Sequence, residues 1–150
     1  KKKISKKDFK KFHPSGSLGT KLKTVEDVML TKEKIPFINE NSSMKRALRV
    51  ITLKKLGTLI VRNSKNNTTG IITDGQIRRI SQKKYNLHTL KVKEVMTKNP
   101  IKVDKDILAM KALSIMNDNK ITSLCVNSNL KKNKTIGIVH IHTILENNIG

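Results

Sequence analysis

A helical pattern of apolar residues follows Ser43, a residue type that commonly caps helix N-termini. Its apolar positions are Met44, Ala47, Leu48 and Ile51. We expect Gly57 to end this helix, because glycine is favoured just past helix C-termini. Two runs rich in β-favouring residues come next, at 58–61 and 70–73. The polar stretch between these two runs predicts a β-hairpin.

The second predicted strand leads into the turn 73–75 and then into a helix that ends near Gln82. We expect Asp74 to cap this helix, because its carboxylate can accept hydrogen bonds from the free N–H groups of the first turn. Arg78 and Arg79 add two cations near a terminus whose dipole also attracts anions. The turn is therefore a candidate anion-binding site, and an ordinary corner with solvated arginines is the alternative.

The same pattern occurs twice in the chain. The matched segments are 70–77 with 137–144, 25–29 with 92–96, and 47–48 with 112–113. The first two pairs are offset by 67 residues and the third by 65, so one loop differs in length by two residues. Matching landmarks in the same order indicate a tandem repeat of a unit of roughly 60 residues.

Each repeat predicts a short helix, an extended segment, a longer helix, two strands and a final helix. In the first repeat the short helix is 24–29, capped by Thr24, and the extended segment is 35–38. In the second repeat the elements are 92–96, 100–103, a helix capped by Asp106, strands at 123–126 and 135–139, and a helix ending near Asn147. The core face of the helix that follows Asp106 is expected to carry Ile107, Met110, Leu113 and Met116.

The predicted fold class is mixed α/β, of the α+β type, with two β-α-β-β-α units related by a pseudo-two-fold axis. One unit has too few apolar residues for a core of its own, so we expect the two to pack sheet against sheet. The expected boundaries are 24–86 and 87–150 for the units. The segment 1–23 is lysine-rich and then irregular after Pro14, and it is interpreted as a linker or the end of another domain.

Composition limits the class of protein. Hydrophobic residues make up 36% of the chain and aromatic residues 3%, so the core must be aliphatic, and we expect the methionines in the core rather than around a cofactor. No apolar run approaches the roughly 20 residues that cross a bilayer, and no signal peptide is evident, which predicts a cytoplasmic protein. Cys125 is the single cysteine and is expected to be a buried strand residue.

The net charge of +21 raises the question of a polyanionic partner. The excess is mostly lysine, it is scattered except at 1–11, and aromatic residues for base stacking are scarce. Lysine, asparagine and isoleucine share AT-rich codons, so we attribute the charge to composition. We expect no specific nucleic acid and no membrane partner, although the charge favours phosphorylated ligands.

The order of elements, ending in Gly-Ile-Ile-Thr-Asp-Gly, resembles a CBS domain pair (a Bateman module) over 24–150. The resemblance implies a nucleotide signature in which a threonine contacts phosphate and an aspartate holds the ribose. Thr73 matches the threonine, but Gln76 stands at the aspartate position. In the second repeat, His140 and Thr143 replace the threonine and the aspartate. Both ribose-binding carboxylates are absent, which argues against ordinary AMP or ATP sensing.

Four further landmarks resemble the D-arabinose-5-phosphate isomerases. They are His-Pro-Ser-Gly-Ser-Leu-Gly at 13–19 before Val-Glu-Asp-Val-Met, the Thr-Asp-Gly turn with its two arginines, Ile-Thr-Ser at 121–123, and the two histidines in 137–142. That family has a sugar isomerase domain followed by a CBS pair, and interconverts ribulose 5-phosphate and arabinose 5-phosphate for synthesis of the lipopolysaccharide sugar Kdo. The resemblance implies that this chain holds the CBS pair and the tail of the isomerase domain. His13 matches a histidine implicated in the isomerase active site, and we expect no catalysis by these 150 residues alone.

We therefore predict a regulatory module that binds a nucleotide or sugar nucleotide between its units, with CMP-Kdo as the main candidate and an adenine nucleotide as another. No cofactor is required. The expected ligand-binding residues are Thr73, Asp74, Arg78, Arg79, Thr97, Pro100, Thr122, Ser123, His140 and His142. Two histidines at i and i+2 make a weak metal site, so no metal is predicted.

We also expect two CBS pairs to associate as a homodimer, in a parent protein that is itself a homo-oligomer. The alternatives are a structural module that only holds isomerase subunits together, or, less favoured, a basic module that binds polyanions without selectivity.

Overall fold

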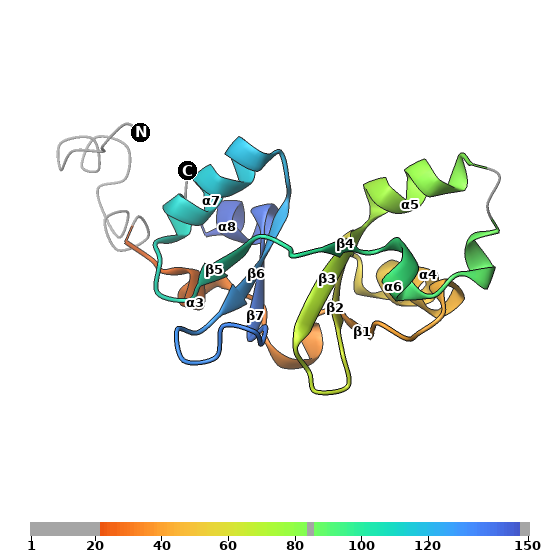
Figure 1. Ribbon diagram of the computed structural model, residues 1–150. Coiled ribbons are helices and arrows are strands. Elements are labelled where there is room, and N and C mark those ends of the chain that lie inside the picture. The colour runs from red at the N-terminus through yellow and green to blue at the C-terminus, as the bar shows by residue number, and fades with distance from the viewer. Residues whose placement is uncertain (1–21, 84–85, 148–150) are drawn as a thin grey trace.

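The computed structural model describes residues 22–83 and 86–147 (Figure 1). Residues 1–21 of the predicted tail, with His13, lie outside the described residues. The first repeat contains α3 (Val25–Val28), η1 (Lys32–Lys34), β1 (Phe37–Asn39), α4 (Met44–Lys54), β2 (Thr58–Arg62), β3 (Thr68–Thr73) and α5 (Asp74–Ser81). The second contains η2 (Leu87–Thr89), α6 (Val92–Val95), β4 (Thr97–Lys98), β5 (Lys102–Asp104), α7 (Ala109–Asn119), β6 (Ser123–Asn127), β7 (Gly137–His140) and α8 (Ile141–Glu146).

The strands form two sheets, one in each unit (Figure 1). The first sheet has the order β1-β2-β3-β4 and the second β5-β6-β7. In both, the first strand is parallel to its neighbour and the next pairing is antiparallel. The predicted mixed α/β fold with two equivalent units is confirmed.

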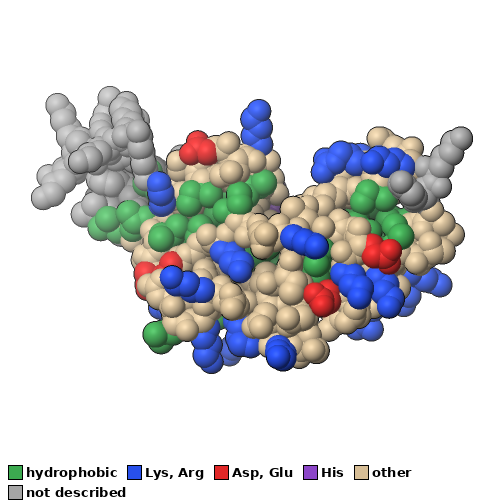
Figure 2. Space-filling view, in the orientation of Figure 1, with side chains coloured by type: hydrophobic (Ala, Val, Ile, Leu, Met, Phe, Trp, Pro, Cys, Tyr) green, Lys and Arg blue, Asp and Glu red, His purple; other side chains and the backbone are tan. Residues whose placement is uncertain are grey.

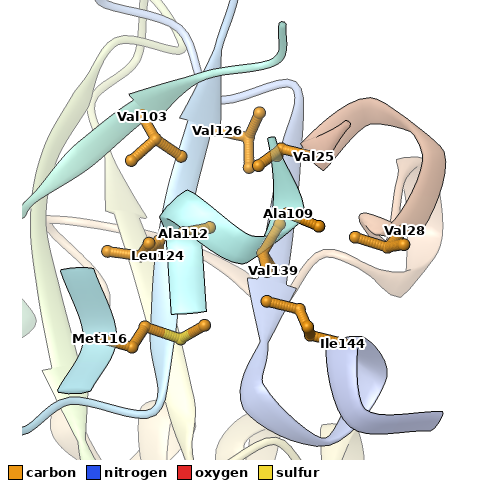
Figure 3. Close-up of a cluster of buried hydrophobic side chains, with 10 residues drawn as sticks. All are labelled: Val25, Val28, Val103, Ala109, Ala112, Met116, Leu124, Val126, Val139 and Ile144. Atoms are coloured by element: carbon orange, nitrogen blue, oxygen red, sulfur yellow. The ribbon is translucent and has the colours of Figure 1, made fainter. Parts of the chain in front are cut away.

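The two repeats exchange their short helices. Val25 and Val28 of α3 are buried in the core of the second unit, where Figure 3 shows them beside Val126, Val139 and Ile144. Val92 and Val95 of α6 are buried correspondingly in the core of the first unit. Each unit's hydrophobic core therefore contains a helix from the other repeat, which couples the folding of the two halves.

The backbone crosses between the units in the same way. β4 follows α6 and pairs antiparallel with β3, placing Thr97 opposite Ile71. The counterpart in the other repeat is an antiparallel bridge between Leu30 and Ile138. These residues differ by the repeat offset, so the crossing obeys the pseudo-two-fold symmetry.

The sheets meet along the pseudo-two-fold axis. Ile35, Ile60, Cys125 and Ile138 form a buried cluster there. At one end of the axis the hydroxyls of Thr58 and Ser123, which are repeat counterparts, are 3.1 Å apart and hydrogen-bonded. Cys125 is 1% exposed, which confirms it as a buried strand residue. Met44 and Met116 are fully buried, so the expected use of methionine in the core is also confirmed.

Two predicted helix starts are wrong. α5 is capped by Thr73, whose Oγ1 accepts a hydrogen bond from the backbone N–H of Gln76 at 3.3 Å, and Asp74 is the first helical residue. α7 begins at Ala109 and not after Asp106. The reason is that Asp106 belongs to the turn after β5, where its N–H donates to the carboxylate of Asp104 at 2.8 Å.

The N–H of Ala109 donates to a backbone carbonyl, that of Lys23, so α7 begins without a side-chain cap. Its fully buried face is Ala109, Ala112 and Met116. Of the predicted core face, Met116 is confirmed as buried, whereas Ile107, Met110 and Leu113 are partly buried and pack against that cluster.

Gly57 does not end α4 as predicted. The left-handed residue after that helix is Lys55, with φ 60°, and Gly57 takes φ 69° two residues later in the turn into β2. Lys120, the repeat counterpart of Lys55, has φ 54° after α7. No described helix has the length and hydrophobicity that a bilayer crossing requires.

Candidate inter-unit binding site

The start of α5 is held by a reciprocal capping box. While Thr73 accepts from the N–H of Gln76, the Gln76 Oε1 accepts from the N–H of Thr73 at 3.0 Å. The Gln76 amide nitrogen donates to Thr97 Oγ1 at 2.5 Å. Gln76 stands where a ribose-binding aspartate was expected, and here its side chain joins α5 to β4 across the two repeats.

Beside this corner is a cavity of about 460 Å³ between the units. It is lined by Thr58, Ile71, Thr73, Gly75, Gln76, Arg79, Thr97, Asn99, Pro100, Ile101, Lys120, Ile121, Thr122 and Ser123. The walls come from β3 and α5 on one side, the segment joining β4 to β5, and the turn between α7 and β6 on the other. Figure 2 shows the molecule hollowed between α7 and α5.

The chemistry of this inter-unit cleft suits an anion with an apolar part. Arg79 and Lys120 supply positive charge from opposite sides, and the lining has no carboxylate. Threonine and serine hydroxyls belong to the lining, while Ile71 and Ile121 supply apolar surface. Small-molecule sites are commonly about 300–1,000 Å³ with few polar groups, so the cleft is large enough for a nucleotide-sized ligand.

The structure brings six of the ten predicted ligand-binding residues to this cleft. They are Thr73, Arg79, Thr97, Pro100, Thr122 and Ser123. Asp74 and Arg78 are exposed on α5 and are not part of its lining. Helical geometry explains the separation of the arginines, because adjacent residues point about 100° apart around a helix.

His140 and His142 lie in the second unit, at the position equivalent to the Thr73 corner. His140 is 8% exposed and caps α8, its Nδ1 accepting from the N–H of His142 at 3.2 Å. The two rings are stacked with centroids 4.9 Å apart. Burial first, and then His142, lower the pKa of His140. The neutral imidazole of His140 therefore caps α8 as the Thr73 hydroxyl caps α5.

Sequence reasoning missed several residues of the cleft. Thr58 is the repeat counterpart of Ser123 and could have been found by applying the offset to that residue. Asn99 and Lys120 have positive φ of 54° each, which the sequence does not reveal. Among the residues in 22–83 and 86–147, no group of three or more histidine, cysteine or acidic side chains is arranged to hold a metal ion.

The fold and the cleft define a tandem α/β module with a candidate binding site between its two units. The chain belongs to the CBS domain family, whose sequence profile matches residues 25–83 and 92–150.

Its relatives include an uncharacterized protein of Rickettsia prowazekii, 34% identical over 142 residues, and the arabinose 5-phosphate isomerase KdsD of Yersinia pestis, 36% identical over 143 residues. These alignments cover 95% of this chain but only 43% of each relative, so the chain spans about two fifths of their length. The fold is similar to that of CBSX2, solved in complex with AMP, with a TM-score of 0.67 and 22% identity over 82% of this chain and 93% of that one.

Proposed function

We propose that this CBS pair is a regulatory module that binds a nucleotide or sugar nucleotide in the inter-unit cleft. The observation that carries the proposal is the combination of Arg79 and Lys120 with hydroxyl groups and apolar surface in a cavity of about 460 Å³. The proposed contacts are phosphate with Arg79, Lys120 and the hydroxyls of Thr73 and Ser123, and the ring system with Ile71 and Ile121. AMP bound to CBSX2, which has the same fold, supports a nucleotide as the ligand class.

The finer proposal concerns the parent activity. We propose that the module regulates a D-arabinose-5-phosphate isomerase of the cytoplasm, with His13 in the isomerase active site, and that CMP-Kdo is its ligand. The similarity to KdsD supports the link. Because Gln76 offers no carboxylate to the ribose hydroxyls, the proposal places the main contacts at the phosphate. Binding would act on activity through its different affinity for two arrangements of the subunits.

A panel of CMP-Kdo, CMP, AMP and ATP tests the function by isothermal titration at physiological salt. The proposal expects saturable binding of at least one of these nucleotides. Arg79→Gln should weaken binding by roughly 10- to 100-fold, since a charge-assisted hydrogen bond is worth roughly 1.5–3 kcal/mol. Arg78→Gln is the matched control, because it removes the same charge from the same helix outside the cleft. Equal loss in both variants, or no saturable binding, would count against the proposal.

One observation favours a second candidate, a structural module without a specific ligand. The side chain of Gln76 is already hydrogen-bonded to Thr73 and Thr97 and so links the two repeats. In that case the titrations are flat, while deletion of the module changes the oligomeric state of the parent protein. A homodimer of CBS pairs is part of both proposals, and sedimentation of the chain measures it directly.

A further inference from the structure

A second cavity, of about 300 Å³, lies in the first unit and shares no lining residue with the inter-unit cleft. Its walls come from β1, the first two turns of α4 and the loop after β2. Two arginines, Arg46 and Arg62, belong to the lining, and no acidic residue does. We refer to it as the outer cavity.

The topology places the outer cavity where α/β units commonly bind ligands. β1 and β2 are adjacent and parallel, and α4 connects them. The cavity lies at their carboxyl ends, where Asn39 pairs with Arg62 and where Ser42 precedes the helix. Side chains at the carboxyl ends of parallel strands and the amino end of the connecting helix converge on a common space.

Arg62 is a preorganised cation in this wall. The central carbon of its guanidinium lies 3.7 Å from the centroid of the Phe37 ring. A guanidinium stacked on an aromatic face keeps its N–H groups free for hydrogen bonds in its plane and has lost much of its conformational freedom already. Within the described ranges, no carboxylate lies within 4.0 Å of Arg62 or Arg46 to neutralise them.

Arg46 stands in an electrostatically unfavourable place unless an anion is present. It is the third residue of α4, after Lys45, and the first turn of this helix contains no acidic residue. Cations at a helix N-terminus oppose the macrodipole, typically by 0.3–1 kcal/mol each. An anion in the outer cavity would interact favourably with both arginines and with the helix terminus.

The second unit lacks this arrangement. At the positions equivalent to Asn39, Arg46 and Arg62 it has Asp104, Lys111 and Asn127. Asp104 brings a carboxylate to the end of β5, and one of its oxygens is buried without a hydrogen-bond partner among the described residues. Asp104 would repel an anion there, so the pair of arginines without a nearby carboxylate is particular to the first unit among the two equivalent positions.

We propose that the outer cavity binds a small phosphate monoester of sugar-phosphate size. The phosphoryl group would face Arg46 and Arg62, whose guanidinium groups suit the geometry of phosphate oxygens. The amide of Asn39 offers further hydrogen bonds, and Val50 and Ile38 offer apolar surface to the carbon skeleton. The volume is at the lower limit for ligand sites, which favours a monophosphate without a nucleobase.

The test is isothermal titration of the 150-residue chain with ribose 5-phosphate at physiological salt, with ribose as the uncharged comparison. We expect saturable binding of the phosphate ester and none of ribose. Arg46→Gln and Arg62→Asn, the latter introducing the residue of the second repeat, should each raise Kd about tenfold, equivalent to about 1.4 kcal/mol. Lys111→Gln makes the same charge change as Arg46→Gln at the equivalent place in the other unit and should leave Kd unchanged.

Arg79→Gln separates the outer cavity from the inter-unit cleft, because it should not affect ribose 5-phosphate binding even if it abolishes nucleotide binding. Failure of the cleft proposal therefore leaves this one intact, and the reverse also holds. Thermal unfolding without ligand checks that each variant is folded. If Arg62→Asn is unstable, Arg46→Gln tests the proposal by itself, because Arg46 is exposed and its replacement should not unfold the protein. Absence of saturable binding, or equal weakening by Lys111→Gln, would overturn the proposal.

Discussion

Replacing Gly70 by alanine tests the crossing of the two repeats. Gly70 lies in β3 opposite Lys98 of β4, the short strand contributed by the second repeat. A Cβ built on Gly70 would lie 2.6 Å from Met96 Sδ and 2.9 Å from the carbonyl oxygen of Thr97. The methionine can move at little cost, but the carbonyl belongs to the crossing backbone, so the strand itself must shift.

Overpacking of this kind typically destabilises a protein by about 1–3 kcal/mol. For a chain of this size each kcal/mol lowers Tm by about 2–4 °C. The control is Gly75→Ala, because its Cβ would lie 3.4 Å from the nearest atom, the terminal Nη1 of Arg79. Alanine is favoured over glycine in a helix by up to about 1 kcal/mol, so this variant should be as stable as the wild type or more stable.

Urea unfolding followed by circular dichroism measures both variants. The expected order of stability is Gly75→Ala, then wild type, then Gly70→Ala, with Gly137→Ala resembling the last because its Cβ would meet Met29 and the Leu30 carbonyl in the other repeat. A Gly70→Ala protein as stable as the wild type would refute the claim that the crossing strand is sterically fixed. Because Thr97 lines the inter-unit cleft, Gly70→Ala should also lower the affinity for any ligand that binds there.

Three further predictions concern the axis and the buried titratable groups. Thr58→Val leaves the Ser123 hydroxyl without its partner and should lower the free energy of unfolding in urea by about 1–3 kcal/mol. Adding Ser123→Ala should recover part of that stability. Additive losses in the double mutant would show that the two hydroxyls do not interact. Burial raises the pKa of Cys125 to about 11, so at pH 8 only about 0.1% of this thiol is ionised. A thiol reagent should therefore react far more slowly with the native than with the unfolded protein. Equal rates would contradict the burial of Cys125. The pKa of His140 is lowered below its ordinary value of 6.5, so the folded state favours the neutral ring, and stability should fall as the pH drops below about 6.5. His140→Asn, which can still cap α8, should show a smaller loss of Tm between pH 7.5 and 5.5. An unchanged loss would show that His140 does not cause it.

Periodicity and the internal repeat were sufficient to predict the fold class. Helices, strands and repeat units follow from local spacing and from the matched segments, both of which the chain displays directly. Helix starts were less predictable. Asp106 has the right chemistry for a cap, but the N–H of Ala109 is satisfied by the carbonyl of Lys23, a residue far away in the sequence. A backbone partner of this kind leaves no local signal.

The sequence by itself determined a tandem pair of α/β units with an aliphatic core, and it named six residues that line the cleft. Only the tertiary structure decided that α3 and α6 pack into the opposite units, that Gln76 is bonded to Thr97, and that Arg79 but not Arg78 faces the cleft. The sequence did not reveal the outer cavity either, since the parallel pairing of β1 and β2 brings Phe37 and Arg62 together and α4 adds Arg46. The physical reason is that side-chain period and propensity are local properties, whereas the contacts that build a site join residues distant in the chain.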